Sequence, residues 1–136
     1  MTIQNVKQFI LEKLEDAASA YGILPEAEGL SQSYNQGNLR LRCLFKNFKI
    51  SPVSDSENIL SGEVIAEVLS LPGEMEMADS LTDYVIEIFS SERGELQNEF
   101  CKILISSVDL LSLKAEGKYF RSGVSFSVTV WDVYGG

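Results

Sequence analysis

Apolar residues recur every three or four positions in two stretches of the chain, which is the spacing of one helix face. The first stretch predicts a helix over residues 3–21, with Thr2 as its N-cap and Gly22 in its stop signal. The second predicts a helix over residues 74–92, with Gly94 as the residue that follows its last turn. Acidic residues in the first turn of this second helix suit the positive end of its dipole.

Other stretches alternate apolar and polar residues, as strands with one buried face do. Strands are predicted over residues 38–50 and 60–71, and a longer one over 99–113 that bends near Ser106 and Ser107. The clearest alternation runs from Val124 to Trp131 and predicts the last strand. The remaining segments, 22–37, 51–59 and 114–117, are predicted to be loops or turns because they are polar or rich in glycine.

These elements predict a single α+β domain over residues 1–136, in the order α-β-β-α-β-β. We expect a mostly antiparallel sheet of four to five strands with both helices packed on one face. The other face carries Arg, Glu, Lys, Ser and Thr, so it should meet water or a partner rather than a second core. No repeat or linker divides the chain.

Charge is unevenly distributed, and this bears on partners. The 136 residues carry a net charge of −9, yet residues 38–51 hold four basic and no acidic side chains, whereas residues 52–99 hold twelve acidic and one basic. A protein that binds nucleic acid directly usually shows a basic stripe and a basic total, so that function is disfavoured. No apolar run is long enough for a membrane span and no signal peptide is recognised, which predicts a cytoplasmic protein without membrane contact.

Catalytic and metal-binding patterns are missing from the sequence. The chain has no histidine, which excludes Ser-His-Asp and Cys-His pairs, and no phosphate-binding glycine motif. Glu63 and Glu67 are the nearest candidates for a carboxylate pair, but the neighbouring basic strand favours a structural role. Cys43 and Cys101 are predicted to be core residues rather than metal ligands or a disulfide. The sequence therefore predicts a protein that is not an enzyme and needs no cofactor or metal.

Two groups of residues are candidates for contacts with other proteins. The first is a charged sheet face made of Arg40, Arg42, Lys46, Glu63 and Glu67, in which Arg40 and Arg42 are expected to lie across from Glu67 and Glu63. It is either an ordinary wet surface or a polar contact between subunits. The second is the aromatic tail.

This tail consists of Trp131 and Tyr134, residue types enriched at interface hot spots. Packing against the domain's own edge is the alternative for both side chains. The polar loops 29–38 and 51–59 are expected to become ordered only on assembly.

The element order, together with a set of fold-type positions, resembles the tail terminator (tail completion) proteins of long-tailed bacteriophages and prophages. The positions are Gly62, Val64, Val68, Pro72, Gly73, Ala78, Asp79, Phe89, Tyr119, Val124, Phe126 and Val128. The turn after Gly73 is shorter than is common in such proteins, and the segment 22–37 matches nothing in them.

The resemblance implies a six-fold ring that caps the tail tube, stops its polymerisation and meets the head-completion proteins. Its place would be the host cytoplasm during assembly and then the virion tail. A ring needs two different patches on each subunit, and the basic strand 38–50 and the acidic segment 52–99 are expected to supply them. The alternative function is a small acidic regulatory or inhibitory protein that binds a basic host protein.

Overall fold

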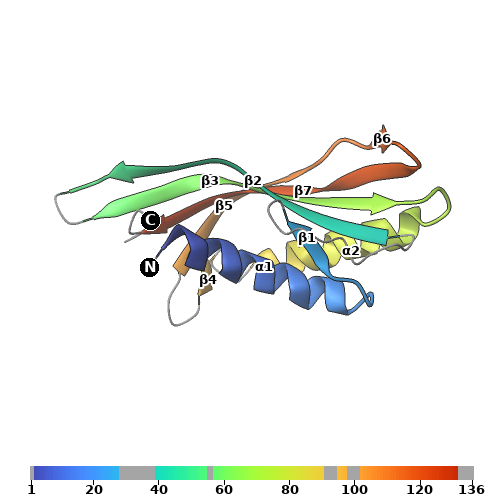
Figure 1. Ribbon diagram of the computed structural model, residues 1–136, viewed down its shortest axis with the longest axis horizontal. Coiled ribbons are helices and arrows are strands. Elements are labelled where there is room, and N and C mark those ends of the chain that lie inside the picture. Colours follow the sequence, from blue (N-terminus) through green and yellow to red (C-terminus); the bar gives the residue numbers. More distant parts are fainter. Residues whose placement is uncertain (1, 28–38, 55–56, 91–94, 98–101, 132–136) are drawn as a thin grey trace.

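The computed structural model describes residues 2–27, 39–54, 57–90, 95–97 and 102–131. These residues form two layers, a twisted sheet and two helices that lie on one of its faces (Figure 1). The predicted α+β class is therefore confirmed. The core lies between the layers, where the inner faces of the strands meet the apolar stripes of both helices.

Helix α1 (Ile3–Ser19) begins where the sequence predicts it and ends two residues earlier. The Thr2 side chain accepts a hydrogen bond from the backbone N–H of Asn5, and the Asn5 side chain accepts one from the backbone N–H of Thr2. This reciprocal capping box satisfies two N–H groups that the first turn leaves unpaired. The face of α1 with Val6, Ile10 and Leu14 is buried.

Helix α2 (Met75–Phe89) follows a turn at Gly73, whose φ of 94° favours glycine. It packs on two central strands of the sheet through Ala78, Leu81, Val85 and Phe89. The Phe89 ring stacks on Phe126 with centroids 4.7 Å apart. Its predicted C-terminal signal, Gly94, lies outside the described residues.

The sheet has seven strands within the described part of the chain. They are β1 (Pro25–Ala27), β2 (Leu39–Pro52), β3 (Asn58–Ser70), β4 (Glu95–Gln97), β5 (Lys102–Leu110), β6 (Lys114–Glu116) and β7 (Tyr119–Trp131). The order across the sheet is β1-β2-β3-β7-β5-β4, and β6 pairs with the first residues of β7. The β1–β2 pair is parallel and the other pairs are antiparallel.

The four long strands match the predicted ones, and the three short strands correct the predicted number. β1 lies in the segment 22–37 predicted as a loop, and β6 lies in the predicted turn 114–117. Residues 28–37 of that loop lie outside the described residues. The expected bend in the strand predicted over 99–113 is present as a register shift between Ile105 and Ser107. The expected polar loop 51–59 is shorter than predicted, because β2 extends to Pro52 and β3 begins at Asn58.

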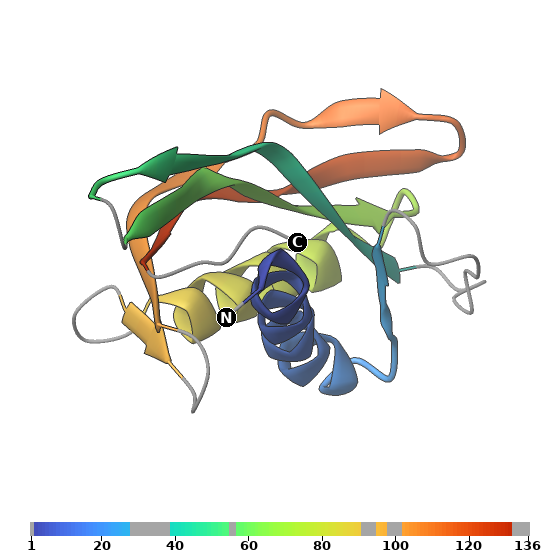
Figure 2. The ribbon, with the colours of Figure 1, turned by 60° about the vertical axis from the view of Figure 1, so that its left-hand side comes forward.

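The two ends of the sheet differ. The ends of β2 and β3 that meet near residues 53–57 extend beyond both helices (Figure 1). At the opposite end, the hairpin of β6 and the beginning of β7 curls away from the helices (Figure 2). The outer face is therefore open at one end and partly covered at the other.

Burial on this outer face departs in part from the expectation that it would meet water or a partner. Ile65, Glu67 and Leu69 of β3 are 8%, 5% and 1% exposed, although their side chains point away from the helices. Guanidinium groups from the two neighbouring strands contact Glu67. One of the three, Glu67, is a carboxylate, and a buried carboxylate needs hydrogen-bond partners or an opposite charge.

Candidate interaction surface

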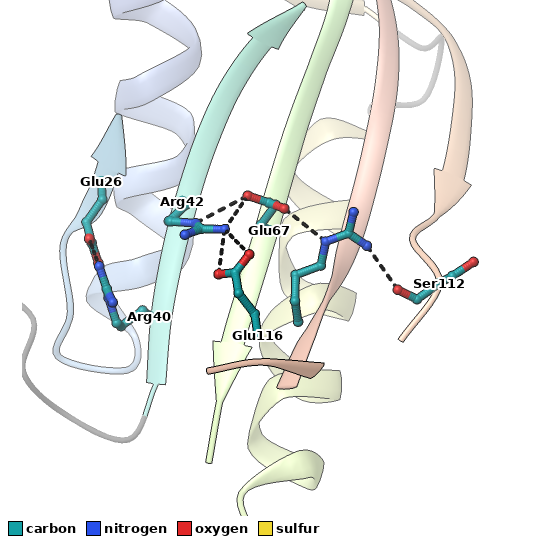
Figure 3. A network of polar contacts seen from close by, with 7 residues as sticks. Glu26, Arg40, Arg42, Glu67, Ser112 and Glu116 are labelled. Carbon is teal, nitrogen blue, oxygen red and sulfur yellow. Dashed lines mark hydrogen bonds and ion pairs between the residues drawn. The ribbon is translucent and has the colours of Figure 1, made fainter. Parts of the chain in front are cut away.

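The buried Glu67 carboxylate is the centre of a polar cluster on the outer face (Figure 3). Its Oε1 accepts hydrogen bonds from Arg42 Nε and Nη2 at 3.2 and 2.8 Å, and its Oε2 accepts one from Arg121 Nε at 2.9 Å. Both carboxylate oxygens are thus engaged by guanidinium groups from the two flanking strands. Such charge-assisted bonds offset part of the cost of burying a carboxylate.

The cluster continues along the covered end of the sheet. Arg42 also pairs with Glu116 of β6 at 2.9 Å, and Arg121 Nη1 donates to the backbone carbonyl of Ser112 at 3.0 Å. The cluster therefore ties β2, β3 and β7 to the segment that contains β6. Since its direct contacts join residues up to 74 positions apart in the chain, the cluster helps to hold the fold together.

Arg40 takes part in a second pairing, at the edge of the sheet. Its guanidinium forms a two-point ion pair with the Glu26 carboxylate of β1 (Figure 3). Its Cζ also lies 5.7 Å from the centroid of the Tyr119 ring, within the range of a cation–π contact. This pairing fastens the short parallel strand β1 to β2.

The predicted cross-strand pairs are wrong in register. Arg42 lies opposite Glu67, Lys46 lies opposite Glu63, and Arg40 lies opposite Leu69. The charge complementarity between the two strands is real, but the pairs are displaced along β2. Glu26, Glu116 and Arg121 were not among the predicted residues. The outward position of Arg121 would have followed from the β7 alternation had that strand been predicted to begin at Tyr119.

The electrostatics of the cluster agree with its geometry. The hydrogen bond to Glu26 raises the pKa of Arg40 above its ordinary value. Burial lowers the pKa of Arg42, but its hydrogen bond to Glu116 and the charge of Glu67 outweigh this effect and raise that pKa overall. Both cations therefore stay charged, and each is paired with a carboxylate of the same chain.

Lys46 and Glu63 are arranged differently from the cluster. They are opposite each other in register and both exposed, and no ion pair joins them. Glu63 is exposed, whereas Glu67 is held by two guanidinium groups, so the two carboxylates do not face each other's environment as the acid pair of a glycoside hydrolase does. Of the five predicted surface charges, Lys46 and Glu63 are therefore the ones most open to an external partner.

A bulge in β2 lies directly after Lys46. Asn47 has a φ of 56°, and the register of β2 on β3 shifts between Lys46 and Lys49. The shift turns the Phe48 ring toward the helix side, where it packs against Gly62 of β3. Phe45 and Phe48 meet edge to face with centroids 5.4 Å apart. Lys46 and Lys49 are exposed on the other side of this kinked strand.

Trp131 ends β7 and is 41% exposed, opposite Ile59 of β3. The Trp131 side chain is therefore accessible to a partner, and the Trp131 backbone is still paired with β3. Tyr134, the other residue of the predicted aromatic tail, lies outside the described residues, as do residues 29–38 and 55–56 of the two polar loops.

Large exposed apolar residues near β5 form a feature that the sequence did not indicate. Val108, Leu110 and Leu113 are 40%, 72% and 58% exposed. Val108 and Leu110 lie opposite Phe126 and Val124, so they are on the helix side of the sheet. They are exposed because α2 packs mainly on β3 and β7 rather than on this strand. An apolar strand seldom remains exposed in this way without a partner.

Cys43 is fully buried, as predicted, and burial raises the pKa of its thiol to about 12. Cys101 lies outside the described residues. We expect the Cys43 thiol of a Cys101→Ser variant not to react with a thiol reagent at pH 8 in the folded chain, and to react fully in denaturant. An unfolded thiol ionises near pH 8.5, so the stabilising contribution of Cys43 is complete below about that pH and falls as the pH rises toward 12. Rapid labelling of the folded variant would contradict this prediction.

Neither a metal-binding group nor a membrane-spanning helix is found among the described residues. No group of three His, Cys, Asp or Glu side chains among them is placed to bind a metal ion. Within the same residues, neither helix is long and apolar enough to cross a membrane.

Comparisons with known proteins show the fold and nothing finer. No family model matches the sequence, and no curated protein matches it significantly. Among solved structures, one whose name states neither function nor source aligns with a TM-score of 0.72, over 96% of this chain and 96% of the other. Since the aligned residues are only 10% identical, this likeness supports a shared architecture alone.

Proposed function

We propose that this chain is a structural protein of a bacteriophage or prophage tail, a tail terminator that forms a ring on the tail tube and joins tail to head. The main support is the combination of a self-contained charged cluster and two open sheet edges of different chemistry. A ring built from one chain needs two different patches on each subunit. The edges of β2 and β5 supply such patches, whereas Arg40 and Arg42 are satisfied within the chain.

The resemblance in sequence supports the same proposal. Gly62, Val64 and Val68 lie in β3, and Val124, Phe126 and Val128 lie beside them in β7. These positions form the centre of the sheet, so they carry the fold that the resemblance implies. The tail role itself rests on the resemblance and on the surfaces.

A second candidate function is supported by the acidic side chains on α2. Glu76, Asp79, Asp83 and Glu87 are exposed and share one helix face. With a net charge of −9, this face suits a regulatory protein that binds a basic host protein. The two functions differ in partner, and the experiment below separates them.

The test begins with the genes beside that of this chain, among which we expect a tail-tube and a tape-measure protein. The full chain is then added to that tail-tube protein as it assembles. We expect tubes of limited length with a ring at one end in electron micrographs, and long tubes without the chain. Uncapped tubes of unchanged length, with recovery of a basic nucleic-acid enzyme in a pulldown, would support the second function instead.

A further inference from the structure

Two of the long strands, β2 and β5, have edges that other described strands cover only in part. β1 pairs only with Leu41–Cys43 of β2, which leaves Leu44–Pro52 open on that side. β4 pairs only with Lys102–Leu104 of β5, which leaves Ile105–Leu110 open at the other side of the sheet. Open edges present rows of backbone N–H and C=O groups that another strand can pair with.

The side chains along these two edges are complementary on both faces. On the helix side, the exposed Val108 and Leu110 of β5 can meet the partly buried Phe45, Phe48 and Ile50 of β2. On the outer side, Asp109 of β5 is exposed, and β2 carries the exposed Lys46 and Lys49. Pairing of the two edges would therefore form an apolar contact on the helix side and an opposite-charge contact on the outer side, as neighbouring strands of one sheet do.

Strand direction also allows this contact. β2 is antiparallel to β3, β3 to β7, and β7 to β5, so β2 and β5 run in opposite directions. A second copy rotated about an axis along the strands therefore brings its β2 antiparallel to β5 of the first. The same rotation keeps the helices of both copies on one side of the continued sheet.

We propose that the open β2 edge, Leu44–Pro52, pairs with the open β5 edge, Ile105–Leu110, of a second copy of this chain. The contact uses two different patches, so repetition closes into a ring when the rotation allows it. The inference rests on the proposed function in one respect, since it names the subunit contact of that ring.

Charge explains why each edge selects the other rather than itself. Two β2 edges would bring Lys46 and Lys49 against their own copies, and like charges in opposite positions are destabilising. Lysine on an edge strand commonly prevents self-pairing in this way. Asp109 on β5 provides the opposite charge. The repulsion between two β2 edges therefore favours pairing of β2 with β5 over pairing of β2 with itself.

The test uses single-cysteine variants of the full chain, Lys49→Cys and Ser107→Cys, each also carrying Cys101→Ser. Lys46 and Asp109 are retained, and buried Cys43 is protected. The two proteins carry tags of different mass and are mixed at high concentration and low salt with a short bifunctional maleimide. We expect at least tenfold more heterodimer than either protein gives as homodimer when treated alone. Asp79→Cys on α2 is the control and should not cross-link to Lys49→Cys.

A second measurement does not depend on cysteines. Lys46→Asp and Asp109→Lys should each weaken self-association at least tenfold in light scattering, and a mixture of the two variants should partly recover it. Homodimers in excess, unchanged self-association of the charge variants, or a monomer under all these conditions would overturn the inference. Heterodimer without any effect on tail tubes would sustain the inference and remove the tail role. Capped tubes whose subunits cross-link through other surfaces would do the reverse.

Discussion

Gly123→Ala is expected to destabilise the chain by about 3–5 kcal/mol, because it combines backbone strain with a steric clash. Gly123 has a φ of 121°, a conformation that side chains rarely adopt. A Cβ atom at this position would lie 2.1 Å from the backbone carbonyl oxygen of Ala66 in β3. That oxygen belongs to the central strand pair, so it cannot move without opening the contact between β3 and β7.

A loss of this size is a large share of the 5–15 kcal/mol that stabilise a typical domain. Urea denaturation followed by circular dichroism measures it as a shift in midpoint at constant slope. Gly117→Ala is the matched control, since Gly117 has a φ of 60° but nothing lies within 4 Å of an added Cβ. We expect it to cost about 1–2 kcal/mol, from conformation alone. Equal losses for the two variants would show that the approach of β7 to β3 is not tight at Gly123.

The long elements could be predicted because their signals are local. Val124, Phe126, Val128 and Val130 alternate with polar residues, and this pattern is enough to place one face of β7 in the core. The stripe on α1 and the Thr2 cap likewise depend on residues within one or two turns. Element type and the α+β class therefore followed from the sequence.

The short strands could not be predicted because neighbours far along the chain create them. β1 and β6 have three residues each, too few for a period to be recognised. β1 forms where β2 offers an open edge and Arg40 holds Glu26. β6 forms against the first residues of β7. Composition alone predicted a loop and a turn for these segments.

In the candidate site, too, local features could be predicted and features that depend on distant residues could not. The opposite charges of β2 and β3 were visible in the sequence, but the register was not. The length of the connection and the bulge between Lys46 and Lys49 set that register, and neither follows from alternation. The burial of Glu67 was also unforeseen, because its cover comes from Arg42 and from Arg121, which lies 54 residues away. These contacts make Glu67 a structural residue that joins β2, β3 and β7.

Glu67→Gln is expected to destabilise the chain by about 2–3 kcal/mol. Removing one partner of a buried ion pair costs about 3–5 kcal/mol, and this figure is reduced here because the side chains of Arg42 and Arg121 are 30% and 23% exposed. Glutamine preserves the shape but removes the charge, and its amide N–H group would face a guanidinium N–H group. Arg42 would then pair only with the half-exposed Glu116 carboxylate, and Arg121 would keep only its hydrogen bond to the backbone carbonyl of Ser112.

Glu63→Gln is the matched control, since Glu63 lies on the same face of the same strand but is exposed. It should change the free energy of unfolding by no more than about 0.5 kcal/mol. The loss from Glu67→Gln should persist at about 1 M salt, because buried pairs are screened much less than exposed ones. Similar small losses for both variants, or a Glu67→Gln loss that disappears in salt, would mean that solvent screens the cluster. The burial of Glu67 between two arginines argues instead for a large, salt-resistant loss from Glu67→Gln. Stability would then depend on Glu67, and the exposed Lys46 and Glu63 would remain available to a partner.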